Sequence, residues 1–157
     1  MKLYLIRHAH ALDGADDAAR PLSGKGRTQV KRLASFLRLS GAFASEEIWH
    51  SPLVRARQTA ELLADRLKLD APRREVTGLA PMDDPRVIAQ RLAREKRALA
   101  LVGHDPHMSA LASLLVAGAM ERPVFELKKC SMLALEHTAG CWLVRWHVSP
   151  ELLAQKS

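Results

Sequence analysis

The sequence predicts an α/β fold: a single three-layer α/β/α domain with a mostly parallel sheet and an antiparallel hairpin near the C-terminus. Apolar runs of strand length alternate with segments of helical periodicity along most of the chain. Two extended segments near the C-terminus flank a turn sequence. The 157 residues, 48% of them hydrophobic, suit one domain over residues 1–157.

The first half of the chain contains two strand–helix units. Leu3–Ile6 is a continuous apolar run, as expected for a strand that is buried on both faces. Ser23–Leu39 has apolar residues at helical spacing, and Gly41 can end that helix. Glu47–His50 is a short second strand, and Leu53–Leu67 is a helix with one apolar face.

The second half continues the alternation. Arg74–Thr77 is expected to be an edge strand, and Pro85–Lys96 is expected to be a helix. Ala98–Val102 is another continuous apolar run and predicts a buried strand. Pro106–Val116 follows as a helix with proline near its N-terminus, where a missing N–H has no cost.

The last two strands form the predicted hairpin. Ser131–Glu136 and Trp142–His147 flank the turn sequence Thr138-Ala139-Gly140. This pairing puts Cys130 and Cys141 at opposite ends of the ladder, so we expect both to be reduced core residues. Free thiols are typical of a cytoplasmic protein.

Composition excludes several function classes. No run of about 18 apolar residues is present, and the N-terminal apolar run is too short for a signal peptide. We therefore expect a cytoplasmic protein with no membrane partner. The net charge of +7 can favour an anionic partner. Aromatic residues make up only 4%, and no basic run contains interleaved aromatics, so no nucleic-acid partner is expected.

Polar residues follow three of the predicted strands. Ligands of open α/β sheets bind beyond the carboxyl ends of the strands, so these residues are candidates for one site. They are Arg7, His8 and His10 after the first strand, Ser51, Arg55 and Arg57 after the second, and His104, Asp105 and His107 after the Ala98–Val102 strand.

Three interpretations of this set are possible. Each residue alone can be structural, but convergence from three distant segments is hard to explain by packing. The spacings His8-x-His10 and His104-x-x-His107 resemble metal ligands. The arginines argue against a cation, because guanidinium groups repel it, whereas they bind phosphoryl oxygens through two hydrogen bonds. We therefore favour an anion pocket and expect no metal.

Four motifs resemble those of the histidine phosphatase (phosphoglycerate mutase-like) superfamily. Arg7-His8-Ala9 looks like its Arg-His-Gly signature, and "SPLVRARQTA" (51–60) is similar to its second arginine motif. "VGHDPHMS" (102–109) resembles its second histidine motif, and "RPLSGKGRTQ" (20–29) resembles a helix start common in the family. The short chain and the "RPL" segment look most like the SixA-type phosphohistidine phosphatases.

The resemblance implies a function and its residues. His8 matches the nucleophile, and Arg7, Arg55 and His104 match the residues that bind the phosphoryl group, so all four are expected to be catalytic. We expect Arg20 to add a substrate contact. No cofactor or metal is implied. The expected activity removes phosphoryl groups from phosphohistidine on a protein, through a covalent phosphohistidine intermediate on His8.

The chain departs from the family pattern at two places. Ala9 replaces glycine, which fits if the backbone there does not need a positive φ. The segment 77–81 lacks the glutamate that donates a proton in larger members. The remaining candidates for a general acid are Asp83, Asp84, Asp16 and Asp17.

This missing acid favours phosphohistidine, whose P–N bond is weak, over alkyl phosphates. The partner is therefore expected to be a phosphohistidine carrier protein or, in the alternative, a small phosphorylated substrate of a phosphomonoesterase. A metal-dependent hydrolase and a non-catalytic phospho-ligand module are the remaining alternatives. The sequence does not predict an oligomeric state. His10 and His107 are expected to line the rim or to be exposed, and Arg57 is expected to be structural.

Overall fold

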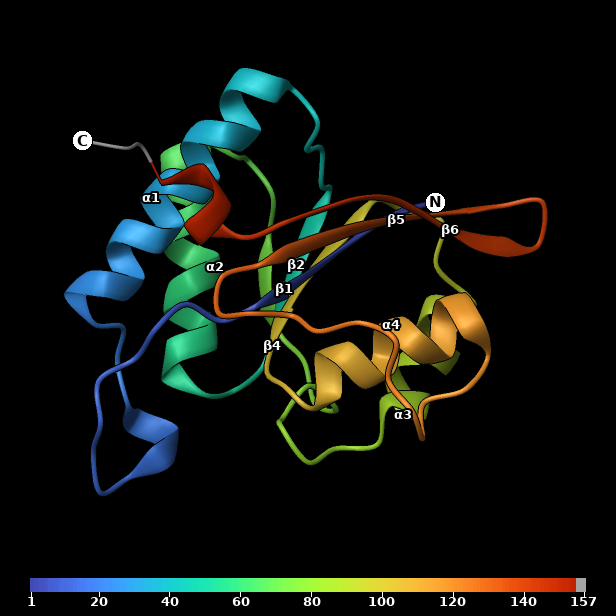
Figure 1. The fold of residues 1–157 in the computed structure, drawn as a ribbon, viewed down its shortest axis with the longest axis horizontal. Helices are drawn as coiled ribbons and strands as arrows, with labels where there is room; N and C mark the ends of the chain where they lie inside the picture. Colours follow the sequence, from blue (N-terminus) through green and yellow to red (C-terminus); the bar gives the residue numbers. More distant parts are fainter. Residues whose placement is uncertain (155–157) are drawn as a thin grey trace.

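A six-stranded sheet forms the centre of the computed structural model, which describes residues 1–154 (Figure 1). The strand order is β3-β2-β4-β1-β5-β6. The first four strands of that order run parallel, and β5 and β6 form an antiparallel hairpin beside β1. Their bounds are β1 Lys2–Arg7, β2 Glu47–His50, β3 Arg73–Glu75, β4 Leu99–Gly103, β5 Met132–Thr138 and β6 Cys141–Val148.

Helices cover both faces of this sheet, which confirms the predicted three-layer α/β/α fold. Two apolar clusters lie on opposite sides of the sheet, one lined by α1 and α2 and the other by α3 and α4. The helices are α1 Gly24–Ser40, α2 Val54–Leu67, α3 Pro85–Leu92 and α4 His107–Ala117, with short 3₁₀ helices η1 Asp17–Ala19 and η2 Pro150–Leu153.

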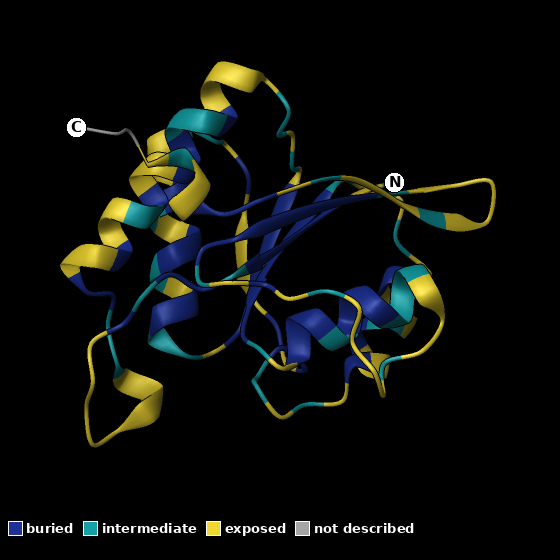
Figure 2. Cartoon of the chain, viewed as in Figure 1, coloured by how far each residue is buried: buried dark blue, intermediate teal, exposed yellow. Residues whose placement is uncertain are grey.

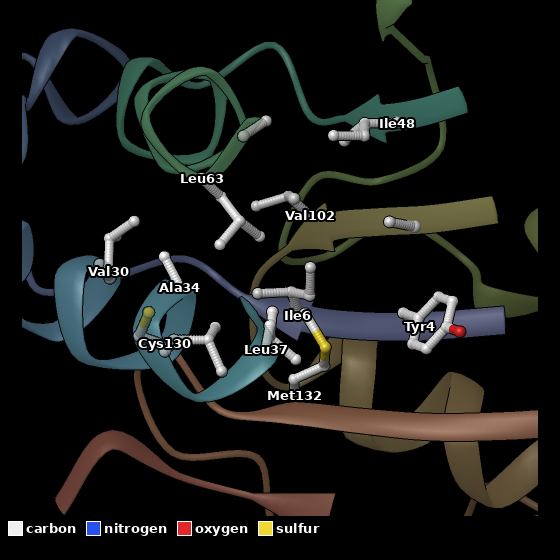
Figure 3. Close-up of a cluster of buried hydrophobic side chains, with 14 of the residues drawn as sticks. Tyr4, Ile6, Val30, Ala34, Leu37, Ile48, Leu63, Val102, Cys130 and Met132 are labelled. Atoms are coloured by element: carbon white, nitrogen blue, oxygen red, sulfur yellow. The ribbon is translucent and has the colours of Figure 1, made fainter. Parts of the chain in front are cut away.

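Strand β1 supplies side chains to both clusters because successive residues of a strand point to opposite faces. Ile6 lies between α1 and α2, and Tyr4 belongs to the same cluster further along the strand (Figure 3), whereas Leu3 and Leu5 belong to the cluster of α3 and α4. Burial on both faces explains why the sequence of β1 is a continuous apolar run. Strands β1, β2 and β4 are correspondingly dark in the burial view, whereas β3 and most of β6 are exposed (Figure 2).

Three details differ from the sequence prediction. Strand β3 is Arg73–Glu75 rather than Arg74–Thr77. Helix α3 ends at Leu92 rather than Lys96, because the segment 94–97 is entirely charged and has no apolar side chain to hold another turn against the sheet. Cys130 is buried as expected, but the prediction for Cys141 is wrong. Cys141 begins β6, an edge strand with mostly exposed residues, so its side chain lies in solvent.

The turn between β5 and β6 has the backbone conformation that the predicted hairpin needs. Ala139 and Gly140 both have positive φ, as a tight two-residue hairpin turn requires. Within residues 1–154, no helix combines the length and apolar character needed to cross a bilayer.

Candidate active site

The carboxyl ends of β1 and β4 lie side by side and place two histidines together. Arg7 pairs with Gly103 in the parallel ladder, and the His8 N–H donates to the Gly103 carbonyl at 2.8 Å. The next residue on each strand is a histidine, so the rings of His8 and His104 lie 4.9 Å apart between centroids. The structure thus brings together two residues that are 96 positions apart in the chain.

One ring nitrogen of His8 is held, and the other has no hydrogen-bond partner within residues 1–154. Nδ1 lies 2.7 Å from the carbonyl oxygen of Ala9, and because a carbonyl only accepts, Nδ1 must donate. Nε2 therefore carries the lone pair. Burial lowers the pKa of His8 to about 4, and the nearby guanidinium groups of Arg55 and Arg7 lower it further. His8 is consequently neutral at pH 7 and keeps a lone pair on Nε2, as a nucleophilic histidine requires.

His104 is also held neutral. Burial is the main cause that lowers its pKa to about 3, with further contributions from His8 and Arg55. Its Nε2 lies 2.5 Å from the hydroxyl of Ser51, the first residue after β2. Its Nδ1 is buried and has no protein partner among the described residues.

Arg55 lies in the first turn of α2, where its guanidinium contacts the η1 segment. Its Nη1 donates to the Asp17 carbonyl at 2.8 Å, and its Nη2 donates to the Asp17 carboxylate at 3.2 Å. The hydroxyl of Thr59, one turn later, donates to the Arg55 carbonyl at 2.7 Å and accepts from the Ala9 N–H at 3.0 Å. Thr59 therefore fixes α2 against the segment that holds His8.

Arg7 and Arg20 approach the site from two other sides. Arg7 Nη1 donates to the Leu127 carbonyl at 2.9 Å and lies 3.8 Å from the Asp105 carboxylate. Arg20 donates to the carbonyl of Leu12 at 2.7 Å and to the carboxylate of Asp17 at 2.9 Å. Arg20 and Arg55 thus share Asp17, which connects the predicted substrate residue to the site.

Each of the four candidate acids already accepts a hydrogen bond. Asp16 caps η1 and Asp84 caps α3, each through a backbone N–H. Asp83 accepts from the Ala80 N–H at 2.9 Å. Hydrogen bonding from Arg20 lowers the pKa of Asp17, with Arg55 acting in the same direction, so this carboxyl is ionised and cannot donate a proton at pH 7.

The remaining predicted residues have different surroundings. His10 is half-buried, and its Nδ1 lies 2.7 Å from the Ser23 hydroxyl. His107 is buried, so the expectation of a rim or exposed position is wrong for it: the first turn of α4 packs against the sheet. Arg57 pairs with Glu61 across one turn of α2, as a structural surface residue would.

The two histidine pairs do not form a metal site in the structure. Within residues 1–154, no three His, Cys, Asp or Glu side chains come close enough together to hold an ion. The structure also accommodates Ala9, which is fully buried and has no positive φ.

Sequence reasoning missed three residues: Thr59, which holds α2, Asp17, which binds Arg55 and Arg20, and Lys129, whose charge helps to lower the pKa of His8. Thr59 lies within the quoted motif, one turn after Arg55, so its helical spacing was a usable signal. Lys129 comes from the loop before β5, where the neighbouring Cys130 N–H donates to the carbonyl of Arg7 at 3.0 Å. Nothing local in the sequence indicates that contact.

Comparisons with known proteins agree with this geometry. Residues 3–83 match the sequence profile of the histidine phosphatase superfamily (branch 1). The chain is 36% identical to an uncharacterized protein of Picosynechococcus, over 97% of this chain and 93% of that protein. It is 30% identical to the phosphohistidine phosphatase SixA of Escherichia coli, over 96% of this chain and 94% of SixA.

A solved structure of protein histidine phosphatase SixA, complexed with tungstate, has the same fold. It superposes with a TM-score of 0.87 at 26% identity and covers 98% of this chain and 100% of that chain. The sequence and the fold therefore agree that the chain belongs to the histidine phosphatase superfamily and is a phosphatase.

Proposed function

We propose that this phosphatase removes the phosphoryl group from phosphohistidine on a protein substrate, through a covalent intermediate on His8. The neutral, oriented ring of His8 beside the guanidinium groups of Arg55 and Arg7 supports its role as the nucleophile. The engagement of all four candidate acids supports the substrate, and this observation carries the proposal.

In the first step His8 Nε2 attacks phosphorus in line with the leaving nitrogen. The new bond is Nε2–P, and the bond that breaks is the P–N bond of the substrate. The departing imidazole takes a proton from solvent, so no placed acid is required. The hydrogen bond from Nδ1 to Ala9 keeps the attacking lone pair on Nε2 and stabilises the cationic ring that forms.

In the second step water attacks phosphorus, the Nε2–P bond breaks and inorganic phosphate leaves. Arg7, Arg55 and His104 bind the equatorial oxygens as charge redistributes in both transition states. Arg20 helps to position Arg55, because both guanidinium groups donate to the carboxylate of Asp17. A phosphoryl oxygen is also a suitable partner for the buried, unpaired Nδ1 of His104.

The substrate is tested by comparing specificity constants on a histidine-phosphorylated protein and on several alkyl phosphates. An alkoxide is a poor leaving group, and a placed acid is worth about 10²–10⁴ in rate, so alkyl esters should turn over slowly. If the esters are the better substrates and Asp83→Asn or Asp84→Asn removes that activity, the protein is a small-molecule phosphomonoesterase.

The cations of the site also supply the charge that a metal would otherwise provide. We therefore propose metal-independent turnover, and full activity should persist in a chelator. Loss of activity on chelation, with recovery in zinc, would favour a metal-dependent hydrolase. Tungstate, which is bound in the SixA structure, should compete with substrate at this site. The free thiols of Cys130 and Cys141 suit the cytoplasm as the place of action.

A further inference from the structure

Helix α1 carries an unusual charge distribution. Its residues Gly24–Ser40 include five basic side chains and no acidic one. Within residues 1–154, none of the five forms an ion pair with a carboxylate, whereas arginines elsewhere on the surface do. The five are Lys25, Arg27, Lys31, Arg32 and Arg38.

These side chains lie on two different flanks of the helix. Lys25 and Arg32 are seven residues apart, which is about two turns, so they share one flank. They line a hollow of about 350 Å³ together with Thr28, Gln29, Pro150 and Glu151. The other flank carries Arg27, Lys31 and Arg38. Both flanks are exposed, and the outward side of α1 is visible in Figure 2.

The flank of Lys25 begins next to the active site. Gln29 accepts a hydrogen bond from the His10 N–H at 2.8 Å, and the Ser23 N–H donates to the His10 carbonyl at 3.0 Å. Gly26 must be glycine because a Cβ there would overlap the His10 carbonyl oxygen. The first turns of α1 are therefore fixed against the segment that holds His8.

Lys129 extends the positive charge from the helix to the mouth of the site. It belongs to the loop that bonds to the backbone of Arg7 and His8 through Cys130. Burial lowers its pKa, and the nearby charges of Arg7, Arg20 and Lys25 lower it further. We call Lys129, Lys25 and Arg32 the basic track.

We propose that the basic track is the docking surface for an acidic protein that carries the phosphohistidine, and that it directs the enzyme toward protein substrates. This inference rests on the proposed function. The track starts at the pocket and extends about 10 Å along α1 between Lys25 and Arg32, so it can bind acidic side chains around the phosphorylated histidine.

The chemistry of the hollow favours a protein over other polyanions. Thr28 and Gln29 offer neutral hydrogen-bonding groups between the two cations. The hollow contains no aromatic side chain on which a base could stack and no large apolar side chain that could enter a membrane. The one carboxylate in it, Glu151, is already paired with Lys128 at 2.9 Å.

The test compares two charge-reversed variants of the full chain on two substrates. The first variant is Lys25→Glu with Arg32→Glu. Its matched control is Lys31→Glu with Arg38→Glu, which makes the same charge change on the other flank of the same helix. The substrates are a histidine-phosphorylated phosphotransfer domain of net negative charge and free phosphohistidine.

We expect the first variant to lose about tenfold or more in kcat/KM on the phosphorylated domain, through KM, and to keep wild-type activity on free phosphohistidine. Its dependence on salt should weaken, since fewer charges steer the encounter. The control should stay within about twofold on both substrates.

Three results would overturn the docking surface: no change in the first variant, equal losses in both variants, or equal losses on both substrates. If the first variant instead loses binding to DNA or to anionic vesicles and keeps its activity on the domain, the track serves another polyanion. Failure of the wild-type enzyme on both phosphohistidine substrates would contradict the proposed function itself.

Discussion

His8 and His107 are two buried histidines near the same end of the sheet, with exposures of 6% and 1%. Burial is the main cause that lowers the pKa of each. His8 has one nitrogen held by the Ala9 carbonyl, and guanidinium groups lie nearby. The ring of His107 lies beside the backbone of Gly78 without a well-directed hydrogen bond, and the closest charges are carboxylates.

The difference shows that burial alone does not make a histidine a nucleophile. A lowered pKa keeps both rings neutral at pH 7, but only His8 has a fixed tautomer and cations that can bind an arriving anion. The carboxylates of Asp83 and Asp84 make the surroundings of His107 negative, whereas those of His8 are positive. Negative surroundings repel a phosphoryl group. The following changes separate the two positions, beginning with the largest expected effect.

Removing His8, the proposed nucleophile, should abolish turnover. His8→Ala should lower kcat by roughly 10⁴–10⁶-fold, the scale seen when a covalent nucleophile is deleted. His107→Leu replaces two unpaired ring nitrogens by an apolar group of similar size and should keep turnover within about threefold. Steady-state kinetics on the two variants measure this contrast, and equal losses would mean that both histidines act in the reaction.

Removing a cation of the site should lower the rate less than removing His8 does. Arg55→Ala deletes a preorganised donor to a transition-state oxygen, which is worth about 10²–10³ in rate. The Asp17 side chain is 64% exposed and can be hydrated when Arg55 is removed, so the melting temperature should change far less than the rate. Arg57→Ala on the same helix is the matched control and should leave kcat unchanged. A large loss of melting temperature with normal kcat would make Arg55 a structural residue.

Removing the support of His104 should have a smaller effect. Ser51→Ala deletes the hydroxyl that contacts His104 Nε2, so the ring can rotate and the rate should fall about tenfold. Ser131→Ala removes another buried hydroxyl, one with no partner among the described residues, and serves as the control. Similar kinetics for the two variants would show that Ser51 does not position His104.

The smallest effect concerns acid stability rather than rate. The folded-state pKa of His8 is about 4 against 6.5 when unfolded, so the unfolded chain binds more protons between these values. The free energy of unfolding is therefore not reduced by His8 above about pH 6.5, and it falls as the pH drops from 6.5 to about 4. His104 lowers it in the same way, down to about pH 3.

His107 contributes in the same direction, because its pKa is also lowered. His107→Leu should therefore make this acid loss shallower, as measured by denaturant unfolding at a series of pH values. A variant curve parallel to that of the wild type would show that His107 already binds a proton in the folded protein.

The sequence predicts those parts of the molecule that depend on local pattern. Buried strands such as β1 and β4 are continuous apolar runs, and the residue that follows each is polar, so His8 and His104 could be placed at one edge. Contacts that depend on how loops and helices pack were not predictable. The Arg55–Asp17 pair, the loop of Lys129 beside Arg7 and the burial of His107 each depend on how a loop or helix packs in three dimensions.

The central claim is that His8 carries the phosphoryl group. Rapid quenching of the enzyme with a substrate labelled in its phosphoryl group should leave label on the protein that is labile in acid and stable in alkali. Mass spectrometry under alkaline conditions should locate it on His8, and His107→Leu should keep it. Label that survives acid, or that maps to Ser51 or to another residue, would contradict the account.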